Sequence, residues 1–367
     1  MSATLSKSAE TESAIKDAAE KLQPRLSART PGEILAMQFD EKDLFLKNGI
    51  FTKGNPLVIL GPGGIGKSRL LLQLVISTIL QLCFLGWEVS PKRLKWLILQ
   101  TENSNRRLKQ DLEQFKKWVG EAAWKIVDRH LVIHTIETDL DCFLGLADRH
   151  IWKMTARLIQ ETRADAVVFD PLYAFAFGNL NSDSGMIKTC QGIGELTRLG
   201  SPHASPVILH HAQSGKAGIA KAVGFNRGSY GRNSKALQSW TRGQINIAQG
   251  SSEDNTKLVL SCGKNSNGPE FAPFGVKLNI QTMVYEIDPD FDLELWQAEV
   301  SGKSSGKIKV QPEDIADLVA AAPLKRKELV ADVMEEFGCQ KSTAYALVDA
   351  ASANNAIRLK AGKYEKV

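Results

Sequence analysis

Short apolar runs alternate with longer helix-forming segments over the first two thirds of the chain. The apolar runs predict strands at residues 57–60, 96–100, 131–135, 166–170 and 207–210. The segments between them predict helices at residues 67–82, 104–118, 145–163 and 186–199. Strands that alternate with helices form a mainly parallel sheet with helices on both faces. We therefore expect an α/β fold whose ligand sites lie at the carboxyl ends of the strands.

The pattern changes after His211. Residues 212–248, the basic segment, are rich in glycine, contain no acidic residue and carry six basic ones: Lys216, Lys221, Arg227, Arg232, Lys235 and Arg242. Its composition predicts a loop. Further strands are predicted near residues 244–248, 257–262 and 277–287, and we expect them to be antiparallel additions to the sheet edge.

Polar segments flank this core on both sides. Residues 1–34 are expected to form a flexible polar arm, either a solvated tail or an arm that bridges subunits. The core is expected to span residues 35–298, and the Ser-, Gly- and Lys-rich residues 299–311 to form a linker. Residues 312–367 predict helices at 313–321, 326–337 and 341–354 and a basic strand pair at 357–367. That order is typical of a winged helix-turn-helix domain.

Composition narrows the class of protein. Of the 367 residues, 43% are hydrophobic and 24% charged, which is ordinary for a globular protein with a sizeable core. The formal net charge of +5 permits a nucleic-acid partner without requiring one. The five cysteines are scattered and form no Cys-x-x-Cys pair, so we expect neither disulfides nor a zinc site. Polar residues interrupt the apolar run at 70–87, and no secretory signal pattern is visible, so we expect a cytoplasmic protein without membrane spans.

One motif lies between the first predicted strand and the first predicted helix. It reads Gly61-Pro62-Gly63-Gly64-Ile65-Gly66-Lys67-Ser68, with Arg69 next in the helix. Glycines let successive backbone N–H groups face an anion, and the helix N-terminus adds partial positive charge. In such a loop the lysine reaches the outer phosphates and the serine hydroxyl holds Mg²⁺. The motif predicts a site for a nucleoside triphosphate, which we take to be ATP, with Mg²⁺.

Two acidic residues follow predicted strands. Asp170 ends the apolar run at 166–170, where a carboxylate can support Mg²⁺, although it can also cap the turn before Pro171. Glu102 follows the run at 96–100 and is our candidate for the base that activates water, because no second carboxylate follows Asp170 directly. The alternative is a residue at the start of a helix, since Thr101 and Asn103 resemble caps.

Two histidines, His210 and His211, close the strand predicted at 207–210. At a carboxyl strand end they can contact the γ-phosphate, and because neighbours on a strand alternate faces, only one of them faces the site. The basic segment that follows can contact the phosphates of single-stranded nucleic acid. It can also supply an arginine finger to the nucleotide of a neighbouring subunit. A solvated basic face is the remaining interpretation.

These motifs, in this order, resemble the RecA-like ATPases of the RepA-type plasmid helicase group, which are related to DnaB-type replicative helicases. The segments that carry the resemblance are 61–68, Leu97–Glu102, Val167–Asp170, Ile208–Ala212, 232–242. The similarity covers roughly residues 35–290. It implies a RecA-like core that assembles as a ring hexamer, with ATP between subunits and central loops that grip single-stranded DNA.

The resemblance also implies residue roles. Glu102 resembles the catalytic carboxylate, His211 the γ-phosphate sensor and Arg242 the arginine finger. Arg232 aligns with the arginine of an Arg-Gly-Ser-Ser motif, but Asn233 and Lys235 depart from that motif, and Arg227 with Gly228 and Ser229 is a second match. The turn that begins at Lys264 resembles a turn that touches the neighbour's nucleotide, although Asn267-Gly268 also suits an ordinary hairpin.

The sequence therefore predicts an ATP-hydrolysing motor on single-stranded DNA, a hexameric replicative helicase of a plasmid, phage or other mobile element. The alternatives are an ATP-switched DNA-binding regulator and a recombination mediator without unwinding activity. The C-terminal unit is expected to bind origin DNA or a replication protein. Its eleven basic and nine acidic residues over 303–367 make a weak charge for tight DNA binding.

Overall fold

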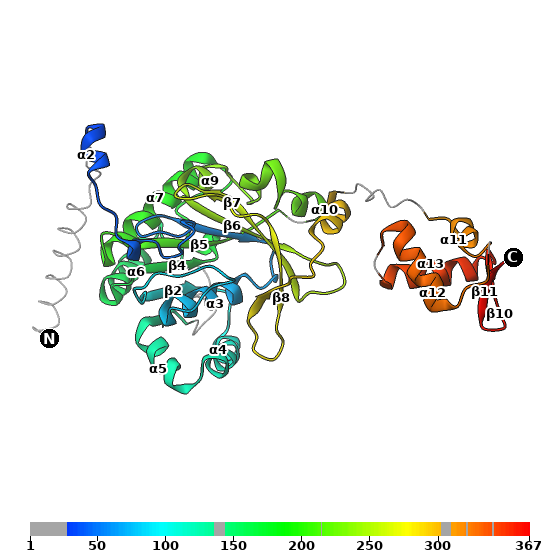
Figure 1. Cartoon of the computed structure of the whole chain (residues 1–367). Helices are drawn as coiled ribbons and strands as arrows, with labels where there is room; N and C mark the ends of the chain where they lie inside the picture. The colour runs from blue at the N-terminus through cyan, green and yellow to red at the C-terminus, as the bar shows by residue number, and fades with distance from the viewer. Residues whose placement is uncertain (1–27, 136–143, 214, 302–309, 321, 340) are drawn as a thin grey trace, which may run out of the picture. The chain divides into compact units, whose positions relative to one another are not determined.

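The computed structural model describes residues 28–135, 144–213, 215–301, 310–320, 322–339 and 341–367 (Figure 1). The chain divides into two compact units at the boundary between Ser301 and Gly302. Most of the expected N-terminal arm, residues 1–27, and residues 302–309 of the expected linker lie outside the described residues. The part of the arm that is described contains a short helix, α2 (Pro31–Leu35), which Thr30 and Glu33 close at its start with a capping box.

One sheet of nine strands forms the centre of the larger unit, as far as the described residues show. Its order is β3-β2-β4-β5-β1-β6-β7-β8-β9. The strands are β1 (Leu57–Gly61), β2 (Trp96–Gln100), β3 (Leu131–Ile133), β4 (Ala166–Asp170), β5 (Ser205–His211), β6 (Gly243–Gln249), β7 (Lys257–Asn265), β8 (Phe274–Leu278) and β9 (Tyr285–Ile287). The first six positions are parallel, and β7, β8 and β9 are antiparallel. The predicted α/β class, a mainly parallel sheet with antiparallel edge strands, is confirmed.

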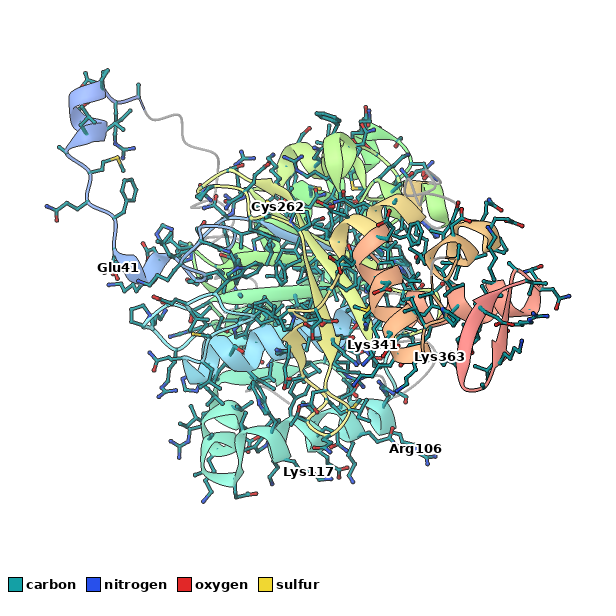
Figure 2. All side chains as sticks on the ribbon, turned by 45° about the vertical axis from the view of Figure 1, so that its right-hand side comes forward. Glu41, Arg106, Lys117, Cys262, Lys341 and Lys363 are labelled. Carbon is teal, nitrogen blue, oxygen red and sulfur yellow. The ribbon has the colours of Figure 1, made fainter. Side chains whose placement is uncertain are left out.

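Helices cover both faces of the sheet (Figure 1). They are α3 (Lys67–Leu80), α4 (Asn105–Val119), α5 (Glu121–His130), α6 (Arg149–Thr162) and α7 (Asp183–Gly200). The core beneath one face contains α3 and the apolar sides of α4 and α5, and the core on the other face contains α6 and α7. Charged residues such as Arg106 and Lys117 lie on the exposed side of α4, whereas Cys262 of β7 is buried (Figure 2).

Two predictions about the second half of the sheet were wrong. We expected β6 to be antiparallel, but it pairs in parallel with β1, with Leu57 opposite Gly243. The reason is that residues 212–242 carry the chain back from the carboxyl end of β5 to the amino end of the sheet, where β6 begins. The strand expected over residues 277–287 is two strands, β8 and β9, because Asn279 closes a turn through bonds from the N–H groups of Gln281 and Thr282.

In the described part of the basic segment, three short helices are found where a loop was expected. They are α8 (Lys216–Ala220), the 3₁₀ helix η4 (Gly224–Ser229) and α9 (Ala236–Trp240). Helix α5 was also not predicted, and Gly120, at φ 82°, separates it from α4. The apolar run at 70–87 begins within α3, whose side chains are mostly buried against the sheet. Over the described residues, no helix is both long and apolar enough to cross a membrane.

Over its described residues, the smaller unit contains three helices and a hairpin. They are α11 (Pro312–Leu318), α12 (Arg326–Phe337), α13 (Lys341–Ala353) and the antiparallel pair β10 (Ile357–Lys360) and β11 (Lys363–Lys366). Its own apolar core joins all three helices to Ile357 and Tyr364 of the hairpin. The element order is the one that the sequence predicted for this segment.

Candidate functional site

The glycine-rich loop connects β1 to α3 at the carboxyl end of the parallel strands. Gly64 and Gly66 have φ values of 73° and 98°, a backbone region that favours glycine. Gly66 is also fixed by packing, because a Cβ there would lie 2.2 Å from the hydroxyl oxygen of Tyr285 on β9. The loop therefore presents its backbone N–H groups and the first turn of α3 as an anion site.

Lys67 lies folded against this loop. Its Nζ donates a 2.7 Å hydrogen bond to the carbonyl oxygen of Pro62, and its side chain is buried. Burial lowers the pKa of Lys67, and the charges of Asp170 and Glu102 partly oppose that shift. The Lys67 ammonium can exchange its hydrogen bond to this neutral carbonyl for one to a phosphate of the nucleotide, because a hydrogen bond between opposite charges is stronger.

Ser68 and Asp170 form the pair expected to hold Mg²⁺. The Ser68 hydroxyl donates a 2.8 Å bond to Oδ2 of Asp170, and Asp170 is 3% exposed at the end of β4. Burial raises the pKa of Asp170 to about 6, against the effect of the Ser68 bond. No group of three or more His, Cys, Asp or Glu side chains suited to a metal occurs among the described residues. Mg²⁺, which favours one or two protein oxygens plus substrate phosphates, fits this donor pair.

Glu102 lies two residues beyond the end of β2, beside Asp170, because Gln100 pairs with Asp170 in the sheet register. Its Oε1 is 3.6 Å from Nε2 of His211 and accepts a 3.2 Å hydrogen bond from the hydroxyl of Tyr173. The ring of Tyr173 stacks on that of His211, with centroids 6.0 Å apart and planes at 21°. The structure thus brings the candidate base and the candidate sensor together through a tyrosine.

His211 and His210 face different surroundings, as neighbours on a strand do. His211 pairs with Gly61 in the sheet, and its Cε1 lies 3.7 Å from the place of a Cβ on Gly63, so its ring is against the phosphate loop. Burial and the charge of Lys67 lower the pKa of His211. His210 is 2% exposed, and burial lowers its pKa to about 4, so it is neutral at pH 7. His211 is thus the histidine that faces the site.

The three candidate arginines lie in different places. Arg232 is near the phosphate loop, since its charge lowers the pKa of both Lys67 and His211. Arg227 forms an ion pair with Glu270 and a 2.9 Å bond to the carbonyl oxygen of Gly224.

Arg242 lies at the opposite, amino end of the sheet, where its backbone N–H bonds to the carbonyl oxygen of Pro56. Its Nη1 bonds to the carbonyl oxygens of Ser239, Trp240 and Thr241 at the end of α9. Nζ of Lys264 bonds to the carbonyl oxygen of Gln238 nearby at 2.9 Å, and the Arg242 charge helps burial to lower the pKa of Lys264. These two cations therefore share one edge and do not face their own chain's phosphate loop.

Arg69, in the first turn of α3, forms an ion pair with helix α4. Its Nη2 lies 2.7 Å from Oδ1 of Asp111, and Arg107 binds the other carboxylate oxygen at 2.9 Å. Both Arg69 and Asp111 are largely buried, so the pair fastens the start of α3 to α4. The ion pair supports the start of α3, and a contact between Arg69 and the nucleotide stays a prediction.

Sequence reasoning missed three residues of the site. Tyr173 belongs to η3 (Leu172–Phe175), directly after β4, and its position three residues beyond Asp170 was the one available signal. Tyr285 is fixed by Gln73 of α3, whose side-chain amide accepts from its N–H and donates to its carbonyl oxygen at 2.7 and 2.8 Å. Nothing in the local sequence pointed to this contact.

The phosphate loop, the paired Ser68 and Asp170, and the mainly parallel sheet define a P-loop ATPase with a RecA-like core. The chain belongs to the AAA domain family, which matches residues 20–217.

Solved structures with a similar fold include a KaiC-like protein from the hyperthermophilic archaeon Pyrococcus horikoshii, at 14% identity and a TM-score of 0.43 over 69% of this chain and 99% of that one. They also include the RadB recombinase, at 12% identity and a TM-score of 0.42 over 64% of this chain and 91% of the other. No curated protein matches the sequence.

Proposed function

We propose that this ATPase is a motor that moves on single-stranded DNA, and that it works as a ring-forming helicase, hexameric like the helicases it resembles, in the replication of a mobile element. The observation that carries the proposal is a direct connection between the nucleotide site and the basic segment. The backbone N–H of Arg232 bonds to the carbonyl oxygen of His211 at 3.0 Å, and Nε2 of His210 lies 3.2 Å from the carbonyl oxygen of Arg232. A shift of the histidines upon loss of the γ-phosphate would move the basic segment directly.

The proposed chemistry uses the residues at the carboxyl ends of the strands. Lys67 and the loop amides would bind the phosphates of ATP, and Ser68 with Asp170 would hold Mg²⁺, whose charge would neutralise that of the phosphates. Glu102 accepts the proton of the attacking water, and His211 contacts the γ-phosphate. Arg242 and Lys264, on the opposite edge, would serve the nucleotide of the adjacent subunit in a ring.

The test is the ATP hydrolysis rate with and without single-stranded DNA, together with the native mass in the presence of ATP. We expect DNA to stimulate hydrolysis, the mass to correspond to a closed ring, and a tailed duplex to be unwound. A rate indifferent to DNA, in a protein that stays monomeric, would remove the proposal.

The smaller unit favours one alternative, an ATP-switched DNA-binding protein that does not unwind. Three helices followed by a hairpin form a compact body of their own, and α13 is its third helix. In helix-turn-helix proteins the recognition helix reads base edges. A strand-displacement assay separates the two functions, because a switch changes its affinity for DNA with nucleotide but leaves a tailed duplex intact.

A further inference from the structure

A cavity of about 260 Å³ lies beneath the basic segment, next to the strand that leads into the phosphate loop. Its lining comes from Leu60 of β1, from residues 213–238 of the basic segment and from Gln244 of β6. Five of its lining side chains carry a carboxamide and come from the segment after β5, from η4, from the turn before α9, from α9 and from β6; they are Gln213, Asn226, Asn233, Gln238 and Gln244. None of the residues that line it is acidic.

The lining changes in character from the inside outward. Leu60, Leu237 and Gln244 are 2%, 5% and 1% exposed and are the most buried side chains of the lining. The cations Arg232 and Lys235 are exposed and lie at the mouth. The cavity therefore offers an apolar and amide-bearing interior and a positive entrance.

These features select a class of ligand. A planar heterocycle with hydrogen-bond donors and acceptors on its edge suits an interior of leucine and carboxamide side chains. An anionic group attached to it suits cations at the mouth. Ligand pockets for drug-sized molecules measure about 300–1,000 Å³, so this slightly smaller space suits a single base with its sugar and phosphate outside.

From this arrangement we infer that the cavity binds one nucleotide, with the base inside and the phosphate at the cationic mouth. The source of that nucleotide rests on the proposed function. We take it to be a nucleotide of the single-stranded DNA bound by the basic segment, with its base turned out of the strand. The inference goes further by assigning a base-binding pocket to each subunit, with Gln238 as the residue that contacts the base edge.

The position of the cavity gives the bound base an effect on hydrolysis. The N–H of Gln213 bonds to the carbonyl oxygen of Tyr230, and the N–H of Arg232 bonds to that of His211. Gln213 also accepts a 2.6 Å bond from Nζ of Lys221, so the end of β5 is tied to the cavity wall by both backbone and side chains. A base that separates these residues acts on the strand end that carries His211.

Gln238 is the residue to change. Its side-chain Nε2 lies against Gly228, where a Cβ would come within 1.9 Å, so the amide is held over the lining. Leucine has nearly the same shape but cannot form a hydrogen bond. The matched control is Gln281→Leu, since Gln281 is an exposed glutamine in the turn between β8 and β9.

The experiment measures the dissociation constant for a 20-residue oligothymidylate and for an abasic strand of the same length. Gln238→Leu should weaken binding of the oligothymidylate by about three- to tenfold, the worth of one neutral hydrogen bond, and leave the abasic strand within about twofold. Lys235→Ala should weaken both strands equally and lower the salt dependence by about one ion. Far-ultraviolet circular dichroism checks that each variant is folded.

A second arm uses free thymidine monophosphate in a calorimetric titration and separates the two sources of a nucleotide. Sensitivity to Gln238→Leu in the strand arm assigns the cavity to DNA, and sensitivity in the monophosphate arm alone assigns it to a free nucleotide. If neither arm changes, the cavity is not a nucleotide site. If the wild-type chain binds no oligonucleotide while the monophosphate arm responds, the proposed DNA motor fails and the pocket remains.

Discussion

The hydroxyl of Ser68 donates a 2.8 Å hydrogen bond to the carboxylate of Asp170, at the place where both oxygens are expected to bind Mg²⁺. This hydrogen bond gives the carboxylate of the buried Asp170 a partner within the chain. If the pair holds Mg²⁺ as proposed, its two oxygens would already lie together before the metal binds.

The first prediction concerns the loss of folding stability that results from burying the charged form of Asp170. Because burial raises the pKa of Asp170 from 3.8 to about 6, the folded chain keeps a proton that the unfolded chain loses between those values. The stability contributed by that proton is complete below about pH 4 and disappears as the pH rises through 6. Asp170→Asn should therefore raise the free energy of unfolding at pH 8 without Mg²⁺, by about 1–3 kcal/mol.

Urea denaturation at pH 4.5 and pH 8 measures this effect. The gain should shrink toward the lower pH, while Asp290→Asn, a change of an exposed carboxylate just before helix α10 (Leu293–Ser301), should show no such trend. An equal difference at both pH values would show that the cause is not protonation.

A second prediction separates binding from chemistry. Lys67→Ala should remove nucleotide binding, because Lys67 is the buried cation of the loop. Glu102→Gln should keep binding and lower kcat by about 10²- to 10⁴-fold, the usual worth of a general base. Binding of a fluorescent ATP analogue and single-turnover hydrolysis measure the two effects. Glu113→Gln, on the exposed side of α4, is the control, and turnover that survives Glu102→Gln would reject Glu102 as the base.

The third prediction tests Tyr173 as a positioning residue. Tyr173→Phe removes the hydroxyl that bonds Glu102 but keeps the ring that stacks on His211. It should lower kcat by about tenfold, because a hydrogen bond to a charged group is worth about 1.5–3 kcal/mol, and leave KM for ATP unchanged. Tyr173→Leu, which also removes the ring, should lower kcat further. Tyr345→Phe, in the smaller unit, is the control, and equal rates for Tyr173→Phe and the wild type would exclude the role.

The fourth prediction concerns a site shared by two subunits. Arg242→Ala should lower hydrolysis by about 10³-fold or more if it acts as a finger. Mixing this variant with Glu102→Gln should restore part of the rate. At some subunit interfaces the intact Glu102 of one variant would then meet the intact Arg242 of the other. Arg227→Ala is the comparison, because Arg227 is engaged by Glu270 in its own chain and should give no such rescue. A wild-type rate for Arg242→Ala would end the assignment.

Much of the location of the candidate site could be predicted from the positions at which the apolar runs end in the sequence. The runs at 96–100 and 166–170 predicted two parallel strands, and the register of Gln100 with Asp170 brings Glu102 beside the phosphate loop. Local patterns were sufficient here, because the carboxyl ends of parallel strands meet at one edge.

The rest depended on distant parts of the chain. The direction of β6 depends on where α9 returns the chain to the sheet, and no apolar pattern within residues 243–249 records it. The contact of Tyr285 with Gly66 depends on the three antiparallel pairings that place β9 in the sheet. Tyr173 is an exposed aromatic residue whose role depends on His211, a neighbour in space alone.

The support of Gly66 by Tyr285 sets a limit on how this protein can be divided. The family match ends at residue 217, yet the phosphate loop is packed against a strand that begins at Tyr285 and is held there by Gln73. A truncated chain or a chimaera with a junction near residue 217 would keep every residue of the glycine-rich loop. It would lose Tyr285, the side chain against which Gly66 packs. The segment that must be kept together for this phosphate loop to fold is therefore longer than the segment that the family match covers. A chimaera with a relative should fold only if its junction lies beyond β9.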